Sequence, residues 1–515
     1  MRRLLALAGL ATMGQAAPET VTRPGNPILA DGRYYSTDPA PIVVGDTLYI
    51  LAGRDEAPDG VNDFIMNEWQ LLSTKDPASG RWQHYPAVAR PEAVFAWADK
   101  GRAYAGQIVR GPDGRFYLYA PVMQRVSDAD DKFAIGVAVA DDVRGPWRDA
   151  HPAGPIISQT VPVANRIQNI DPTVLVEGRK VTIIWGTFGQ LRGMTLAPDM
   201  VTPVGPEVTL TGATGFFEAP WLMERRGTYY LIYAANTAGP DSPCTPAVYY
   251  ACQAFASAPS PLGPWTYRGV ILPPVSSTTS HAGAAEFKGQ WYLAYHTADA
   301  KGGGHFRRSV AIDRMAWDDS VTPAAIRPVV PTRAPQPVRP SRNVAPAAVA
   351  SASNQPVPVQ FWLGALNDGK VRAAPLPPDM WGTWRGADTP RQAWIAYRWP
   401  APVTLNASRI RFFADHPAGA TEGVAPPAAW RLDYWRDGGW QTVPGLRHEA
   451  AERDGFETVT FPTITTRCLR AVFDASYDAK GSAAVAVEEW EALTPTMHVV
   501  TPVPSPVSVP PCAAR

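Results

Sequence analysis

One pattern of hydrophobic and polar positions recurs five times in the first 330 residues. Each copy is a glycine-containing turn followed by a short aromatic and β-branched run: GDTLYIL from Gly45, DGRFYLY from Asp113, GRKVTIIWG from Gly178, RGTYYLIYA from Arg226 and KGQWYLAYH from Lys288. Such runs are typical of strands that leave a tight turn. A repeat of this length suits a four-stranded blade, so five copies predict an all-β, five-bladed β-propeller over residues 26–330.

A second repeated segment follows each copy. Trp- or Pro-bearing segments come after the five phrases: SGRWQHY at 79, VRGPWRD at 143, LAPDMVTPVG at 196, LGPWTYRG at 262 and MAWDDSVTP at 315. We expect the outer strands of the blades to begin there.

Polar residues stand at a fixed place before the repeated turns. Asp38 and Asp171 each lie seven residues before the turn glycine, Glu218 lies nine residues before it, and Gln107 and His281 hold this place in the other two copies. The innermost strands of a propeller start together at one end of the central channel, so these side chains are predicted to share one pocket. A single Asp-Pro is usually a turn starter, but two at the same phase, with a Glu in a third copy, indicate joint chemistry.

Composition and charge narrow the class of ligand. The 54 Pro, 42 Gly, 18 Trp and 18 Tyr favour turns and short strands over long helices. Lys plus Arg and Asp plus Glu both number 47, which favours a neutral substrate over nucleic acid or another polyanion. The start, MRRLLALAGLATMGQAAPET, is typical of a secretory signal peptide over residues 1–17. We therefore expect a secreted or periplasmic protein with no membrane partner.

The ordered motifs resemble glycoside hydrolase family 43. The resemblance covers about residues 26–330 and rests on NPILADGRYYSTDPAPIVVGDTLYIL, NIDPTVL, FFEAPWL, the two Gly-Pro-Trp segments and SHAGAAEF. It implies a five-bladed propeller that hydrolyses glycosides with inversion, in arabinose- and xylose-containing oligo- or polysaccharides of the arabinoxylan or arabinan type. It also implies that Asp38 is the general base, Glu218 the general acid, and Asp171 the carboxylate that orients the acid and adjusts its pKa. The expected activity is α-L-arabinofuranosidase, β-xylosidase or both.

Other site residues follow from the same resemblance and from residue type. His281 holds a place where members of the family keep a histidine near the channel axis, often beside a water-coordinated calcium ion; no cofactor is expected for catalysis, and structural calcium is the one metal considered. Asp55, Glu56 and Asp63 form either a pocket rim or a solvated loop. Candidates for binding the sugar are Gln107, Phe217, Trp69, Trp97, Phe188 and His281.

The carboxy-terminal part predicts a second domain. Residues 331–357 are rich in Pro, Ala and Ser and predict a linker, whereas residues 358–495 predict a β-sandwich. The phrase ALNDGK is similar to discoidin-like, galactose-binding-like modules, which implies either carbohydrate binding through Trp381, Trp384 or Trp440 or a non-binding support. Residues 496–515 predict an unstructured tail. Cys244 and Cys252 either close a loop or remain free thiols.

Three alternatives stay open. One is another pentose or galactofuranose glycosidase on the same fold. Another is an invertase-like retaining hydrolase, although Thr37-Asp38-Pro39-Ala40 and Glu218-Ala219 depart from the Asn-Asp-Pro-Asn and Glu-Cys phrases of those enzymes. The third is a sugar-binding propeller without catalysis, which would not need a matched acid and base.

Overall fold

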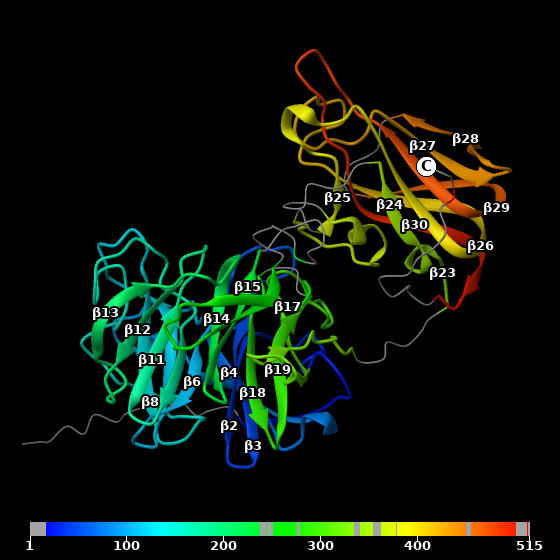
Figure 1. The fold of residues 1–515 in the computed structure, drawn as a ribbon. Helices are drawn as coiled ribbons and strands as arrows, with labels where there is room; N and C mark the ends of the chain where they lie inside the picture. Colours follow the sequence, from blue (N-terminus) through cyan, green and yellow to red (C-terminus); the bar gives the residue numbers. More distant parts are fainter. Residues whose placement is uncertain are drawn as a thin grey trace, which may run out of the picture. The chain divides into compact units, whose positions relative to one another are not determined.

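The computed structural model describes residues 17–236, 244, 251–275, 279–333, 340–353, 362–376, 379–449, 455–500 and 512. The chain divides into two compact units, one containing most residues up to Ala334 and the other most residues from Pro335 onward (Figure 1). The signal peptide predicted for 1–17 lies almost wholly outside the described residues, as does most of the tail predicted from 496.

The first unit is a five-bladed β-propeller, as predicted (Figure 1). Blade I has the order β1-β5-β4-β3-β2, and blades II to IV each have four strands in sequence order. Blade V is β18-β19-β20, and β21 and β22 form a separate hairpin. The strands are β1 (Glu19–Thr22), β2 (Tyr35–Val44), β3 (Thr47–Asp55), β4 (Trp69–Thr74), β5 (Arg81–Ala89), β6 (Gln107–Arg110), β7 (Phe116–Met123), β8 (Phe133–Ala140), β9 (Arg148–Asp149), β10 (Thr173–Glu177), β11 (Lys180–Trp185), β12 (Arg192–Leu196), β13 (Pro203–Thr209), β14 (Phe216–Arg225), β15 (Thr228–Ala235), β16 (Cys252–Ala258), β17 (Thr266–Leu272), β18 (Ala282–Phe287), β19 (Gln290–Thr297), β20 (Ser309–Met315), β21 (Trp317–Asp318) and β22 (Ala325–Ile326).

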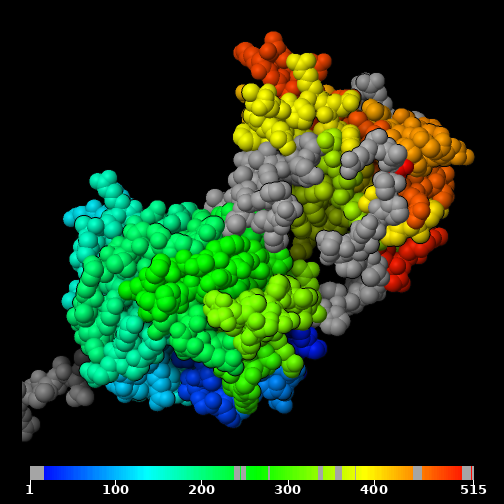
Figure 2. Space-filling view, viewed as in Figure 1, coloured from blue at the N-terminus to red at the C-terminus, as the bar shows by residue number. Residues whose placement is uncertain are grey.

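The inner strands form a closed ring. Successive inner strands are in contact, from β2 to β6, β10, β14, β18 and back to β2. The surfaces of blades III and IV meet without a gap in the space-filling view, in cyan-green and green (Figure 2). Helical segments are short: α1 spans Pro91–Val94 and the 3-10 helix η1 spans Pro77–Ser79. No helix among the residues described above is long and apolar enough to cross a membrane.

The repeated phrases are the inner hairpins of the blades. Gly45, at φ 58°, turns β2 into β3, and Gly178, at φ 61°, turns β10 into β11. Both glycines adopt the left-handed conformation that a tight hairpin needs. The Trp- or Pro-bearing segments precede or enter the outer strands, including β9, β13 and β17. The sequence period therefore corresponds to one blade.

The start of the chain closes the ring beside blade V. The Ile28 amide donates to the Val310 carbonyl at 2.8 Å. The Asn26 side chain pairs with the backbone of Ile312, donating at 3.0 Å and accepting at 2.9 Å. These bonds attach the segment between β1 and β2 to the edge of β20, so residues near the two ends of the propeller sequence hold each other.

The second unit is a β-sandwich (Figure 1). Its main sheet path is β23-β30-β26-β29-β27-β28, with β24 paired to β26 and β25 to β30. Alternate residues of β26, such as Ile395 and Tyr397, are buried in its core. The elements are β23 (Ser341–Asn343), β24 (Val349–Ala352), β25 (Trp381–Gly382), β26 (Gln392–Phe413), β27 (Ala429–Arg436), β28 (Gly439–Glu449), β29 (Phe456–Asp474), β30 (Ala486–His498) and the 3-10 helices η2 (Ala345–Ala347), η3 (Leu363–Asn367) and η5 (Gly386–Asp388).

The second unit extends beyond its predicted bounds. Strands β23 and β24 lie inside the segment predicted as a linker, and β30 continues to His498, past the predicted end at 495. The physical reason is packing: Val344, Ala345 and Ala348 are small, but they are buried in the sandwich core. The Pro- and Ala-rich composition predicted a linker because the few apolar residues that pack in the core cannot be recognised from that composition.

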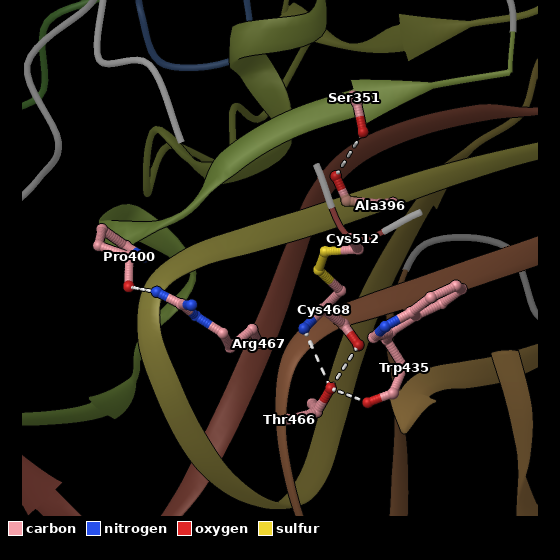
Figure 3. Close-up of a disulfide and its surroundings, with 8 residues drawn as sticks. All are labelled: Ser351, Ala396, Pro400, Trp435, Thr466, Arg467, Cys468 and Cys512. Carbon is pink, nitrogen blue, oxygen red and sulfur yellow. Dashed lines mark hydrogen bonds between the residues drawn. A yellow bond between two sulfur atoms is a disulfide. The ribbon is translucent and has the colours of Figure 1, made fainter. Parts of the chain in front are cut away.

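Two disulfides are present among the described residues. Cys244 pairs with Cys252, one of the two alternatives left open by the sequence. Cys468 pairs with Cys512, which was not expected (Figure 3). Beside it, the Thr466 hydroxyl donates to the carbonyls of Trp435 and Cys468, both at 2.9 Å (Figure 3). The second disulfide thus attaches the far end of the chain to the sheet at β29.

Candidate active site

Three carboxylates from three blades converge on the channel. Asp38 lies on β2, Asp171 lies two residues before β10, and Glu218 lies on β14; all three are buried. The amide of Ala219 donates to Asp171 Oδ2 at 3.2 Å, which joins blades III and IV directly. Asp38 lies close enough for its charge to act on both other carboxylates. The convergence expected from the repeat is present.

The backbone has the same unusual conformation at or directly after each of these carboxylates. Asp38, Asp171 and Ala219 have φ values of 53°, 55° and 56°, and each precedes a proline. In β2 and β14 the pairing with the next strand is interrupted at this point, as in a β-bulge. A non-glycine residue in this region costs roughly 1–3 kcal/mol, so the surrounding fold must hold it there. The residue equivalent to Asp38 in blade IV is thus Ala219, and Glu218 precedes it by one.

Asp38 is held in its charged form. Its Oδ1 accepts from Arg308 Nη1 at 3.2 Å and from the Thr37 hydroxyl at 3.0 Å. Burial raises the pKa of Asp38, but the charge of Arg308, helped by His296 and His281, outweighs burial and holds this pKa well below its usual range. The carboxylate therefore stays ionised throughout the physiological range.

Arg308 is itself locked by a second carboxylate. Its Nε and Nη2 donate to Asp55 Oδ2 and Oδ1, each at 2.9 Å, and its backbone amide also donates to Asp55 Oδ2 at 2.9 Å. The guanidinium lies over the Phe64 ring, 5.1 Å from its centroid. This two-pronged pairing leaves Nη1 directed at Asp38 and at the Thr279 hydroxyl, 2.9 Å away. Asp55 is thus a buried support for the site.

Glu218 and Asp171 have the opposite electrostatic environment. Burial is the main cause that raises the pKa of Glu218 to about 7; the hydrogen bond from Thr187 opposes this rise, and the negative charge of Asp38 adds to it. Burial also raises the pKa of Asp171 well above its ordinary value, with the charges of Glu218 and Asp38 acting in the same direction. Near neutral pH this pair therefore retains a proton, while Asp38 does not.

Glu218 and Asp38 each have one carboxylate oxygen that accepts hydrogen bonds and one that accepts none from the described residues. The Thr187 hydroxyl donates to Glu218 Oε2 at 2.9 Å, whereas no described residue donates to Oε1. The bonds to Asp38 are made at Oδ1, and Oδ2 accepts none within the described part of the chain. One oxygen of each group can therefore face a ligand while the other fixes its orientation.

Two histidines adjoin Asp38. His281 Nδ1 lies 3.9 Å from Asp38 Oδ1, and burial is the main cause that lowers the pKa of His281 to about 4. His296, at the end of β19, accepts the Asp38 backbone amide at Nδ1 over 3.2 Å. His281 therefore lies at the site as a neutral imidazole, beside the group predicted as the base.

Three residues predicted to bind the sugar have structural roles. Trp69 is fully buried and donates to the Tyr104 carbonyl at 2.7 Å, so its ring has no face for a ligand and that prediction is wrong. Gln107 is buried and accepts the Val174 amide, which ties blade II to blade III. Trp97 donates to Asp149 at 3.1 Å and packs against Phe95.

The remaining predicted residues divide between the site and its surroundings. Phe217 is buried next to Glu218, and the exposed ring of Phe188 meets it edge-on at 5.6 Å. Glu56 accepts from the amide and side chain of Asn67 and does not adjoin the carboxylates in any contact of the described residues. Asp63 is exposed and pairs with Arg102 at 3.4 Å, as a rim or loop residue would.

Sequence reasoning missed Arg308, His296 and Thr187. A signal existed for two of them: His296 ends the phrase KGQWYLAYH, and Arg308 directly precedes the next strand. Because antiparallel neighbours alternate in direction, the end of β19 and the start of β20 lie at the same end of blade V as His281. Thr187 follows β11 in the same way, two residues after its end.

The arrangement brings a carboxylate whose pKa is lowered close to one whose pKa is raised, as glycoside hydrolysis by inversion needs. A model of the glycosyl hydrolases family 43 matches residues 24–323, more than half of the chain. The chain belongs to glycosyl hydrolases family 43. It is therefore a glycoside hydrolase, and an acid and base pair of this kind needs no cofactor for the chemical step.

Relatives of this chain are named as xylosidases or arabinosidases. A xylosidase/arabinosidase of Bacteroides ovatus is 29% identical over 331 residues, covering 55% of this chain and 92% of the relative. A beta-xylosidase of Xylanibacter ruminicola is 26% identical over 329 residues, covering 55% and 94%. A crystal structure of a family 43 beta-xylosidase/alpha-arabinofuranosidase from a compost microbial metagenome, in complex with xylotriose and in a calcium-free form, covers 61% of this chain and 98% of its own at 24% identity, with a TM-score of 0.49.

Proposed function

We propose that this protein is a secreted inverting glycosidase that removes arabinose or xylose units from plant oligo- or polysaccharides, as an α-L-arabinofuranosidase, a β-xylosidase or both. In this proposal Asp38 is the general base, Glu218 the general acid, and Asp171 the group that orients Glu218 and raises its pKa. The observation that carries it is the convergence of three buried carboxylates from three blades, with Asp38 bonded to Arg308 and with Glu218 in surroundings that raise its pKa to about 7.

The reaction follows from these two protonation states. Asp38 takes a proton from a water as the water oxygen forms a bond to the anomeric carbon. The bond from that carbon to the leaving oxygen breaks, and Glu218 donates its proton to this oxygen. Asp38 then loses its proton to solvent and Glu218 regains one. The two carboxyl groups of an inverting enzyme are about 6.5–9.5 Å apart, which leaves room for the water.

The substrate class rests on the relatives and on charge. Those reported above are named for xylosidase and arabinosidase activity, and the chain has a formal net charge of zero, which suits a neutral glycan. A beta-D-galactofuranosidase of Aspergillus niger, 26% identical over 255 residues, keeps galactofuranosides among the candidates.

A panel of three nitrophenyl glycosides tests the activity: an α-L-arabinofuranoside, a β-D-xyloside and a β-D-galactofuranoside. Proton NMR of the first product formed then gives its anomeric configuration. Inversion is expected on one of the pentosides. A retained configuration would support an invertase-like mechanism, and binding without turnover on every glycoside would support a sugar-binding propeller.

A structural calcium ion beside His281 does not fit the surrounding residues well. Calcium prefers six to eight oxygen ligands, but no group of three or more His, Cys, Asp or Glu able to hold a metal occurs in the described part of the chain. Asp38, the carboxylate that pairs with His281 among the described residues, already pairs with the buried cation Arg308. We therefore derive no step through a metal.

The second unit is proposed to bind carbohydrate, but not through all three of the predicted tryptophans. Trp381 is fully buried, which removes it from the candidates. Trp384 is 39% exposed, and Trp440 carries the Arg470 guanidinium 4.4 Å above its ring. Retardation of the protein in gels that contain arabinoxylan tests this role. Loss of retardation in Trp384→Ala would assign the contact to that residue, and an unretarded wild type would favour a support role.

A further inference from the structure

The turn between β11 and β12 presents an aromatic ring beside the proposed acid. Thr187 donates to Glu218 Oε2, and the next residue, Phe188, has 61% of its surface exposed, the largest exposed fraction of any aromatic residue among the described positions. Its only ring contact within that set is the edge of Phe217, at 5.6 Å between centroids. Phe217 directly precedes Glu218 in β14. Phe188 is therefore linked to Glu218 in two ways: through Thr187, its neighbour in the sequence, and through Phe217, which its ring contacts.

The backbone at Phe188 is unfavourable for this residue. Its φ of 50° lies in the left-handed region, where bulky side chains are outliers. The turn is held by three hydrogen bonds of 3.0 Å, from Gly186 to the Ile170 carbonyl, from Gly189 to the Phe217 carbonyl and from Gln190 to the Thr187 carbonyl. Glycine or asparagine would suit such a position better.

Folding alone does not explain this residue. A phenylalanine contributes to stability when its ring is buried, but here most of the ring faces water and the backbone is strained. Strained residues that the surrounding structure holds in place cluster at sites that bind ligands. The feature that phenylalanine adds at this position is an exposed apolar ring, directly after the residue that bonds Glu218 and in contact with the residue that precedes Glu218.

The chemistry of the reaction says which part of a glycan would meet this face. The acid donates its proton to the oxygen that joins the cleaved sugar to the leaving group, so the leaving group lies on the acid's side of that bond. Arg308, His281 and Asp38 adjoin one another on the base's side. Thr187, Phe188 and Phe217 adjoin Glu218.

We propose that Phe188 is the platform for the leaving group: its ring stacks on the apolar face of the pentose unit that departs when the glycosidic bond breaks. Sugar rings carry such faces, and aromatic side chains are suited to them. The inference rests on the proposed function, with Glu218 as the acid. It makes Phe188 a determinant of which aglycone the enzyme accepts, separate from the sugar that it cleaves.

Two substrates with the same cleaved sugar separate the two parts of the site. One is a pentose oligosaccharide, whose leaving group is a sugar; the other is the corresponding glycosyl fluoride, whose leaving group is too small to reach a platform. Phe188→Ala is expected to lower kcat/KM on the oligosaccharide by about three- to tenfold, the range for an aromatic contact, and to leave the fluoride within twofold. Phe188→Trp should retain the oligosaccharide activity.

Stability gives an independent readout. Phe188→Gly removes the ring and relieves the backbone, so its thermal midpoint should rise above that of Phe188→Ala while both variants lose the same activity on the oligosaccharide. Lys288→Gly is the matched control, because Lys288 has φ 52° in an exposed hairpin turn between β18 and β19. It should raise the midpoint without changing the kinetics on either substrate.

The outcomes distinguish this proposal from the proposed function. Equal losses on both substrates, or full activity of Phe188→Ala on the oligosaccharide, would overturn the platform while leaving the glycosidase intact. A wild-type protein that hydrolyses neither substrate would overturn the glycosidase proposal itself.

Discussion

Arg308 donates a hydrogen bond of 3.2 Å to Asp38 across 270 residues of sequence, with both side chains buried. Asp55 holds the other two donor positions of the same guanidinium. One cation thus serves two carboxylates, and the proposed base remains ionised because Arg308 cannot lose its proton at any physiological pH.

Replacing Arg308 should shift the acid limb of the pH profile. Without the full guanidinium the pKa of Asp38 rises toward its ordinary range or above it, because burial then acts with less opposition. In Arg308→Lys we expect kcat/KM to begin falling at a pH at least one unit higher than in the wild type, by an order-of-magnitude estimate from partial loss of one charge contact. The measurement is kcat/KM from pH 3 to 9.

The control for this change is Arg225→Lys, since Arg225, at the end of β14, makes a two-pronged pair with Asp319, directly after β21, at 2.6 and 3.0 Å. It should leave both limbs unchanged. Arg308→Met should cost about 3–5 kcal/mol in the free energy of unfolding, because two buried carboxylates lose their partner. An unshifted acid limb in a folded Arg308→Lys would show that Arg308 does not control the base.

Thr187 should determine where kcat/KM falls on the alkaline side of its pH profile, which is the alkaline limb. Its hydroxyl donates to Glu218 Oε2 and so favours the charged form, which lowers the pKa that burial raises. Thr187→Val removes the donor, so the pKa of Glu218 should rise and the limb, near pH 7 in the wild type, should move to higher pH by on the order of one unit. The same kcat/KM titration measures it.

Thr173→Val is a matched control for a buried threonine. The Thr173 hydroxyl accepts the Leu222 amide at 2.9 Å and bonds no carboxylate of the described residues. This variant should lose comparable stability with no shift of the limb. A limb that moves to lower pH in Thr187→Val would contradict the assignment of Glu218 as the group that titrates.

The repeat in the sequence was enough to predict the propeller and the meeting of Asp38, Asp171 and Glu218. Five hairpin turns in phase define five blades, and a ring of blades leaves little freedom in where inner strands begin. The same logic predicted that His281 shares their pocket, and its Nδ1 lies 3.9 Å from Asp38 Oδ1. Local pattern was sufficient here because each feature depends on its distance from a turn in its own blade.

Contacts between blades could not be predicted in this way. Arg308 and Asp55 are 253 residues apart, and neither belongs to a repeated phrase that would align them. Trp69 and Gln107 were expected to face the sugar, but burial depends on what the next blade presents to them. Cys468 and Cys512 likewise gave no sign of pairing, because their distance in space is set by the sandwich.

The disulfide between Cys468 and Cys512 should stabilise the second unit only. It closes a sequence separation of 44 residues, for which loop entropy predicts a contribution of about 4 kcal/mol to the free energy of unfolding. Cys512→Ser should lower the midpoint of one calorimetric transition and leave turnover of a small nitrophenyl glycoside unchanged. A single lowered transition with lost turnover would show that the two units do not unfold independently.

Glu218→Gln should make the protein more stable at pH 8 than the wild type. The folded pKa of Glu218, about 7, exceeds the ordinary value of 4.5, so the folded state binds the extra proton and wild-type stability falls as pH rises from about 4.5 to about 7. The glutamine carries no charge and escapes this loss. A shift of this size corresponds to roughly 3 kcal/mol in the free energy of unfolding above pH 8, and to almost none at pH 4.

Urea unfolding of both proteins at pH 4, 6 and 8 measures the difference. The control is Glu286→Gln, on the exposed side of β18, whose free energy of unfolding is expected to stay within about 0.5 kcal/mol of the wild type at each pH. A constant difference across the three pH values would show that the buried carboxylate does not bear the raised pKa on which its role as the acid depends.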